Sequence, residues 1–252
     1  MAMDQSSKSQ WESLLTAAHA WQLSPDDLPI VAMERHHLGW LTPNERLVHQ
    51  KFKTPDLRHA YLVSRTLCRA TLSKYTGVDP AAWKFVTGAH GKPAIAGPRG
   101  FGTLRFNMTH TSGLVICIVT RAGEVGVDAE EITRRVDIDQ VSRHFFSEPE
   151  RASLASLLAR KRTARFFEQW VLKEAYLKGP GKGLFLSPEK FTIEIDRNGK
   201  PSDLGKWQLA LHRLGRRHVA ATAIRRRRGN GPVPIAWFSA ERLLKAGVAI
   251  KR

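Results

Sequence analysis

Apolar and polar residues are spaced along the chain in a way that predicts two long helices. From Pro55 to Tyr75 the apolar residues recur at intervals close to 3.6, and Gly77 ends the pattern. The stretch from Arg165 to Lys178 is also expected to be helical, because Gly179 and the proline after it form a typical helix end. Each stretch predicts a helix of several turns.

Two shorter helices are predicted from capping boxes. Thr42 stands three residues before Glu45, with proline between them, so a helix should begin there and run toward Phe52. Ser147 and Glu150 repeat the same spacing and open a further helix.

Short apolar and β-branched runs predict strands between these helices. The predicted strands are Trp83 to Thr87, Leu104 to Asn107, Leu114 to Thr120, Val125 to Glu130 and Phe191 to Asp196. The segment from Ala89 to Gly102 is rich in glycine and proline, so it is expected to form loops.

The two halves of the chain resemble each other. The predicted helix with Arg65 is followed by Gly91-Lys92-Pro93, and the helix with Lys173 is followed by Gly199-Lys200-Pro201, with an offset of 108 residues in each case. Such a repeat suggests duplication of one structural unit. We therefore expect an α+β fold of two pseudo-symmetric lobes, 1–122 and 123–252, each a small antiparallel sheet packed with a long helix.

Composition narrows the class of protein. The chain has 252 residues, enough for a full core, and its 40 Lys and Arg exceed its 23 Asp and Glu by 17 charges, which predicts a polyanionic partner. Cys68 and Cys117 lie in apolar stretches, so a disulfide framework is excluded. The polar start of the chain and the strand-length apolar run from Leu114 to Val119 favour a soluble, cytoplasmic protein with no membrane span.

Two acids on one strand are the first candidate site. The alternation of side chains along a strand places Asp128 and Glu130 on one face and Val127 and Ala129 on the other. Two carboxylates on one face repel each other, and short acidic side chains suit Mg²⁺. The alternative is a solvated strand end, with Glu131 as a third surface acid.

A second candidate cluster lies in the helix from Trp170 to Lys178. Glu174 and Lys178 have the i, i+4 spacing of an exposed ion pair, which is the simpler interpretation. Glu174 also lies among apolar residues, so a partly buried face would bring a third carboxylate to Asp128, with Lys178 reaching a phosphate.

A third candidate cluster ends the predicted strand that begins at Leu104. Thr109, His110 and Thr111 together form a donor-rich rim that can hold a phosphate, although a lone histidine is more often structural. Lys92 in its Gly-Lys-Pro turn adds a donor.

The basic residues are unevenly distributed. From Leu57 to Gly123 there are nine Lys or Arg and one acid, Asp79. From Arg213 to Arg228 there are seven arginines, which in the simplest interpretation form a peripheral or disordered basic segment.

These motifs together resemble a known family. They are Gly91-Lys92-Pro93, the run from Phe106 to His110, the run from Val125 to Glu130, and the run from Trp170 to Lys178. In this order and spacing they are similar to the 4′-phosphopantetheinyl transferases of the two-lobed, monomeric class, which activates peptide, polyketide and fatty acid synthases.

The resemblance implies an activity and a set of roles. It implies that coenzyme A and Mg²⁺ bind between the lobes, and that the phosphopantetheine arm passes to a serine of an acyl or peptidyl carrier protein, releasing adenosine 3′,5′-bisphosphate. Asp128, Glu130 and Glu174 would bind the metal. The residues on the coenzyme A side would be Arg46, Arg65, Gly91, Lys92, Asn107, Thr109, His110, Asp128 and Lys178. Thr109 stands where the family usually has serine, and it keeps the hydroxyl.

Catalytic roles are expected for Glu174, Lys178 and His110. Glu174 is the candidate base for the acceptor serine, directly or through a metal-bound water, because a carboxylate at the metal lies within reach of the incoming hydroxyl. Carrier proteins are typically acidic, so the positive charge of the chain would also steer their approach.

Two other classes of protein remain as alternatives. A basic nucleic-acid-binding protein, with Arg225 to Arg228 as a phosphate-binding arm, explains the charge but not the acids. A Mg²⁺-dependent nuclease explains both, but it predicts an E-x-K sequence on the metal strand, and Glu130-Glu131-Ile132 lacks it.

Overall fold

The protein folds into two compact units. A computed structural model describes residues 5–88, 91–181, 187–227, 229 and 231–244. The first unit is drawn from residues 1–86, 93–122 and 234–252, and the second from 87–92 and 123–233. The sequence placed all of 123–252 in one lobe, whereas the segment after Pro234 joins the first unit, because its strand pairs there with a strand near the N-terminus.

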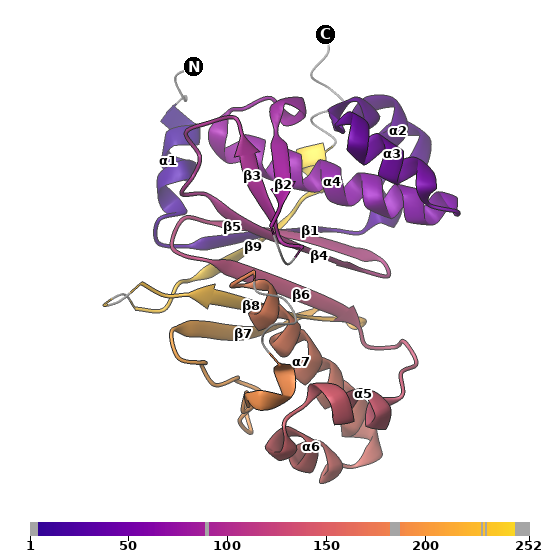
Figure 1. Cartoon of the computed structure of the whole chain (residues 1–252), viewed down its shortest axis with the longest axis vertical. Coiled ribbons are helices and arrows are strands. Elements are labelled where there is room, and N and C mark those ends of the chain that lie inside the picture. The colour runs from indigo at the N-terminus through magenta and orange to yellow at the C-terminus, as the bar shows by residue number, and fades with distance from the viewer. Residues whose placement is uncertain (1–4, 89–90, 182–186, 228, 230, 245–252) are drawn as a thin grey trace. The chain divides into compact units, whose positions relative to one another are not determined.

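Both units combine helices with β-strands (Figure 1). The helices are α1 (Gln5–Ser13), α2 (Ile30–His37), α3 (Pro43–Lys51), α4 (Pro55–Thr76), α5 (Ile138–Phe145), α6 (Glu148–Ala155) and α7 (Ala159–Lys178). The strands are β1 (Ala18–Leu23), β2 (Lys84–Thr87), β3 (Pro93–Gly97), β4 (Arg105–Thr111), β5 (Leu114–Thr120), β6 (Val125–Glu131), β7 (Trp207–Leu214), β8 (His218–Arg225) and β9 (Ile235–Ser239).

The predicted capping boxes and the glycine stop of the long first-unit helix are confirmed. Thr42 and Glu45 form a reciprocal capping box at α3, and the Thr54 side chain caps α4. Gly77 ends α4 with a φ of 68°, a conformation that glycine adopts without strain. Helix α7 begins six residues before the predicted start, at Ala159.

In the first unit a four-stranded sheet packs against α4. The strand order is β4-β5-β1-β9, and β9 runs parallel to β1 while the other pairs are antiparallel, so this sheet is mixed and not purely antiparallel as predicted. Leu67 and Leu72 of α4 pack with Val115 and Cys117 of β5 in one core cluster.

A separate hairpin of β2 and β3 carries the first Gly-Lys-Pro tripeptide. Strand β3 lies inside the segment that the sequence assigned to loops, so that prediction was wrong. The hairpin pairing satisfies the backbone in spite of the many glycines and prolines.

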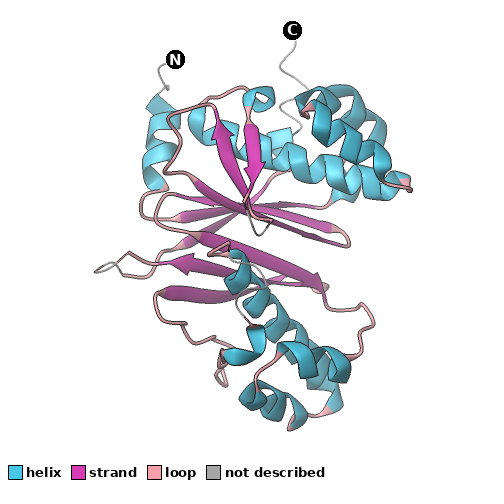
Figure 2. Ribbon diagram, viewed as in Figure 1, coloured by secondary structure: helices cyan, strands magenta, loops and turns pink. Residues whose placement is uncertain are grey.

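In the second unit a three-stranded antiparallel sheet, ordered β6-β8-β7, packs against α7 (Figure 2). The core between them contains Val171 and Ala175 of α7 with Val219, Ala221 and Ala223 of β8. This helix-on-sheet packing matches the expected α+β class.

The internal repeat appears in the backbone hydrogen bonds of the two Gly-Lys-Pro turns. Gly88 N donates to Lys92 O at 3.0 Å, and 108 residues later Asp196 N donates to Lys200 O at 2.9 Å. Gly91 and Gly199 also match, with φ angles of 83° and 79°. The two turns therefore have the same local geometry.

Two further predictions differ from the structure. The segment from Phe191 to Asp196 is not a strand; it holds a single bridge between Ile195 and Pro201. Of the last arginine run, Arg225 ends β8, and Arg226, just beyond the strand, lies 2.8 Å from Asp203. Arg228 lies outside the described residues.

Within the described ranges, no helix combines the length and the apolar character required to cross a membrane.

Candidate active site

Helix α7 lies directly on strand β6 because Gly126 has no side chain. A Cβ atom at Gly126 would lie 2.0 Å from the carbonyl oxygen of Ala175 and 2.6 Å from the amide nitrogen of Gly179. Gly126 pairs with Ala223 and Asp128 with Ala221, both core residues on the α7 side of β8. Asp128 and Glu130 therefore point to the α7 face of the sheet.

Three carboxylates and one lysine meet on this face. Lys178 Nζ lies 2.5 Å from Asp128 Oδ1, and the Asp128 side chain is buried. Burial raises the pKa of Glu174, and the negative charges of Asp128 and Glu130 raise it further, while Lys178 opposes the shift. We call Asp128, Glu130, Glu174 and Lys178 the acid cluster.

The third acid, Glu130, also contacts an arginine. Arg134 Nη2 lies 3.0 Å from Glu130 Oε1, and the Arg134 guanidinium lies 5.5 Å from the ring centre of Phe167 on α7. The sequence did not single out Arg134, because the contact forms across the turn that follows β6 and no helical spacing indicates it.

The donor set of the acid cluster fits Mg²⁺, which prefers carboxylate oxygens, keeps water ligands and shares its shell with phosphates. In the part of the chain that the structure describes, no three His, Cys, Asp or Glu side chains are already grouped as metal ligands. Instead, Asp128 lies against Lys178 and Glu130 against Arg134.

Lys92 belongs to the same unit as the acid cluster. Its Nζ donates to the carbonyl oxygens of Val125 at 3.0 Å and Gly179 at 2.5 Å, and it lies 3.4 Å from Glu124. These contacts hold the first Gly-Lys-Pro turn, including Gly91, against the start of β6 and the end of α7. The sequence also offers Lys182, in the glycine-rich turn that follows Lys178, as a further contributor, and this residue lies outside the described residues.

The residues of the third predicted cluster lie in the first unit, on two faces of β4. Asn107 and Thr109 pair with Ile118 and Ile116, whereas His110 pairs with Val115, a residue of the α4-side core. His110 therefore points to the opposite face from Asn107 and Thr109, and it is exposed while they are buried. The predicted rim of adjacent donors is thus divided by strand alternation.

Two predicted coenzyme A contacts also lie in the first unit. The guanidinium of Arg65 lies 5.2 Å from the ring centre of Tyr61, one turn away on α4. Arg46 Nη1 donates to the Leu41 carbonyl at 2.9 Å, which ties α3 to the preceding segment.

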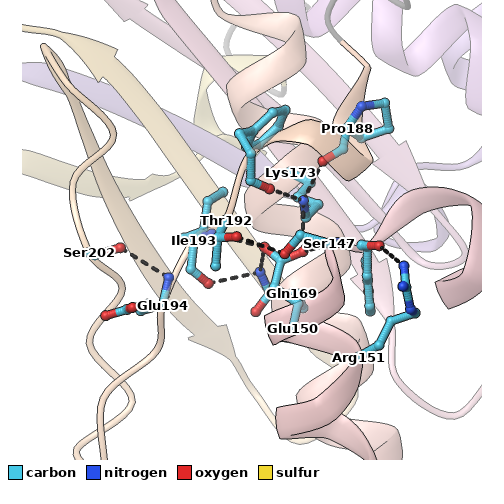
Figure 3. A network of polar contacts seen from close by, with 12 residues as sticks. Ser147, Glu150, Arg151, Gln169, Lys173, Pro188, Thr192, Ile193, Glu194 and Ser202 are labelled. Atoms are coloured by element: carbon cyan, nitrogen blue, oxygen red, sulfur yellow. Dashed lines mark hydrogen bonds and ion pairs between the residues drawn. The ribbon is translucent and has the colours of Figure 1, made fainter.

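Lys173, although part of the quoted motif, has a structural role (Figure 3). Its ammonium is fully buried, 2.7 Å from Glu150, and donates to the carbonyls of Pro188 and Phe191. Burial lowers the pKa of Lys173, and Glu150 opposes that shift. Glu150 also accepts from the amides of Ser147 and Ile193, so one buried pair joins α6, α7 and the segment after it.

A family comparison matches residues of this unit. The family model of the 4′-phosphopantetheinyl transferase superfamily matches residues 124–223, which include β6, α7, β7 and most of β8. The 4′-phosphopantetheinyl transferase HetI of Nostoc sp. is 28% identical over 181 residues, covering 66% of this chain and 76% of HetI.

The chain belongs to the 4′-phosphopantetheinyl transferase superfamily. The 4′-phosphopantetheinyl transferase Sfp of Bacillus subtilis is 27% identical over 177 residues, covering 70% of this chain and 76% of Sfp. Among solved structures, the holo-[acyl-carrier-protein] synthase of Thermotoga maritima aligns with 41% of this chain and 64% of its own, at 25% identity and a TM-score of 0.34. The superfamily match includes every member of the acid cluster.

Proposed function

We propose that this protein transfers the 4′-phosphopantetheine arm of coenzyme A to a serine of an apo carrier protein and releases adenosine 3′,5′-bisphosphate. It is an enzyme of the phosphopantetheinyl transferase class. The observation that carries the proposal is the meeting of Asp128, Glu130 and Glu174 with Lys178 on one face of the second unit.

The acid cluster would hold Mg²⁺ through Asp128, Glu130 and Glu174. When bound, Mg²⁺ neutralises charge on the diphosphate of coenzyme A and so favours the departure of the leaving group. No protein nucleophile is required, because the carrier serine attacks the phosphorus itself.

The cationic side chains of the protein would bind the phosphates. Lys178 lies beside Asp128 and is the donor nearest to the acids. Lys92 is held close to the end of α7 by its carbonyl contacts. For Arg46, Arg65, Asn107, Thr109 and His110 of the first unit, the family resemblance implies roles toward the nucleotide, and these roles stay predictions.

Glu174 is the proposed base for the carrier serine. A carboxylate at the proposed metal site lies within reach of the incoming hydroxyl, directly or through a metal-bound water. Lys178 lies one helical turn away and favours the ionised form that the base requires.

The family membership favours transfer over the nucleic-acid alternatives, because the acids and the basic residues then serve one reaction. The test is to incubate the protein with coenzyme A, Mg²⁺ and an apo carrier protein, and to measure the carrier mass and the release of adenosine 3′,5′-bisphosphate.

We expect the carrier to gain the phosphopantetheine mass in step with nucleotide release. The variants Asp128→Asn and Glu174→Gln should lose at least about 100-fold in rate, as is typical when a charge-stabilising group is removed, with circular dichroism unchanged. Near wild-type rates in either variant would remove that residue from the mechanism.

A further inference from the structure

A group of arginines in the second unit has no part in the proposed transfer chemistry. Arg134 and Arg135 follow the end of β6, while Arg213, Arg216 and Arg217 come from the end of β7 and the turn into β8. We call these five residues the arginine surface. All five are exposed.

The two segments of the arginine surface lie side by side. Glu131 of β6 pairs with His218 of β8, and Leu214 of β7 pairs with the same residue. The amide of Ile132 donates to the carbonyl of Arg217 at 2.8 Å. Both segments therefore lie at the same end of the sheet, where β6, β8 and β7 run next to one another (Figure 1).

Glutamates neutralise only part of this charge. Arg134, Arg213 and Arg217 contact Glu130, Glu168 and Glu131, yet 43%, 55% and 66% of their side-chain surfaces stay exposed. The five arginines thus outnumber the three glutamates that they contact. Exposed guanidinium groups match the geometry of carboxylates on a partner, since each can form paired hydrogen bonds with one.

The arginine surface begins next to the acid cluster. Arg134 contacts Glu130, which is itself a member of that cluster. The Arg134 guanidinium also lies over Phe167, and Phe167 precedes Glu174 on α7 by seven residues, or about 10 Å of helix. A protein docked on the arginines is close enough to present one of its side chains to the acids.

We propose that the arginine surface docks an acidic face of the apo carrier protein and so brings the acceptor serine to the acid cluster. The proposal rests on the proposed function. A protein partner fits better than a nucleic acid, because Glu130, Glu131 and Glu168 lie among the arginines. A folded protein can place separate carboxylates against the arginines and away from these glutamates, whereas a nucleic acid presents an unbroken row of phosphates.

The test uses two charge-reversal variants with equal changes in net charge. Arg135→Glu/Arg216→Glu alters the arginine surface at exposed positions outside the acid cluster. Lys200→Glu/Lys206→Glu alters exposed positions of the same unit, and Lys206 immediately precedes β7, at the end of that strand opposite to the turn. Transfer kinetics are measured with an acidic apo acyl carrier protein, and binding is measured by anisotropy of the same carrier carrying a fluorescent label.

We expect Arg135→Glu/Arg216→Glu to raise the KM for the carrier by about tenfold or more, with kcat and the KM for coenzyme A nearly unchanged. Added salt should weaken wild-type binding and reduce this difference. The lysine variant should change the carrier KM by less than about twofold.

Equal effects of the two variants, or no effect of either, would overturn the docking surface. The docking surface would also be overturned if Arg135→Glu/Arg216→Glu lost binding to a single-stranded DNA oligonucleotide while its carrier binding stayed unchanged. If the wild-type protein transfers nothing to any carrier, the proposed function is wrong, and the anisotropy measurement still decides whether the arginines bind an acidic carrier.

Discussion

The sequence indicated the positions of the acids Asp128 and Glu174 to different degrees. The strand alternation predicted that Asp128 and Glu130 share a face, and the register of β6 with β8 agrees. Glu174 could be interpreted from sequence either as one half of an exposed ion pair or as a third acid. The raised pKa of Glu174, caused by burial and by Asp128, favours the second interpretation.

The polar cluster on β4 shows where residue-level prediction reaches its limit. Thr109 and His110 are neighbours in sequence, and that proximity suggested one binding rim. A strand sends neighbouring side chains to opposite faces, so adjacency in sequence argues against a shared surface. The same alternation rule that placed Asp128 and Glu130 together would have separated Thr109 from His110.

His37 leads to a prediction at the residue scale. It is fully buried beside Trp40, and a hydrogen bond with the backbone of Met33 partly opposes the effect of burial on its pKa. Burial lowers its pKa below the ordinary value of 6.5, and the charge of His36 lowers it further. The unfolded chain therefore takes up a proton near pH 6.5 that the folded protein does not, and stability is lost as the pH falls through this range.

The variant His37→Phe removes this proton uptake. We expect its unfolding free energy, measured by urea denaturation, to fall less between pH 8 and pH 5 than that of the wild type. His144→Gln, at an exposed position, should keep the wild-type slope. Parallel slopes for His37→Phe and the wild type would show that His37 does not control the acid sensitivity.

At the scale of elements, the helices were predicted better than the strands. Capping boxes and a C-terminal glycine are local signals, and they located α3, α4 and α6. Strand β3 and the irregular segment from Phe191 to Asp196 were assigned wrongly because pairing depends on partners elsewhere in the chain. Strand β9 was not predicted for the same reason, since its partner β1 lies more than 200 residues away in sequence.

The contact between β6 and α7 gives a prediction at this scale. Gly126→Ala places a methyl carbon 2.0 Å from a helix carbonyl, so α7 must move away from the strand. We expect a loss of about 1–3 kcal/mol in unfolding free energy, together with a fall in transfer rate, because Glu174 and Lys178 move with the helix. Urea denaturation and the transfer assay measure the two effects.

Gly231→Ala is the matched control for Gly126→Ala. A Cβ atom at Gly231 meets nothing within 4 Å, and its φ is not in the left-handed range. This variant should keep both the stability and the rate of the wild type. If Gly126→Ala behaves in the same way, close packing of α7 on β6 is not what positions the acid cluster.

At the scale of the whole molecule, a repeated Gly-Lys-Pro tripeptide pointed to a duplicated architecture. The two Gly-Lys-Pro turns share their hydrogen bonds and their glycine conformation. Their lysines now differ in surroundings: Lys92 binds carbonyls at the end of α7, while Lys200 is exposed. The repeat was visible in sequence because each turn requires a glycine with positive φ. The pairing of β9 with the first unit left no local sequence signal.

Some of the chain's excess positive charge can be assigned to one surface. The excess of 17 positive charges indicated an anionic partner without naming a surface. The structure places five of the exposed arginines at one end of the second sheet, where Arg134 contacts Glu130 of the acid cluster. Part of the positive charge therefore lies next to the residues of the proposed chemistry.

Metal binding in the presence of coenzyme A tests the central claim most directly, because it does not depend on finding the right carrier. Mn²⁺ substitutes for Mg²⁺ at oxygen sites and is observed by electron paramagnetic resonance. We predict that the wild-type protein with coenzyme A binds one Mn²⁺, and that Asp128→Asn and Glu174→Gln each weaken this binding by about tenfold or more while remaining folded. Unchanged Mn²⁺ affinity in both variants would contradict the claim that these acids form the metal site.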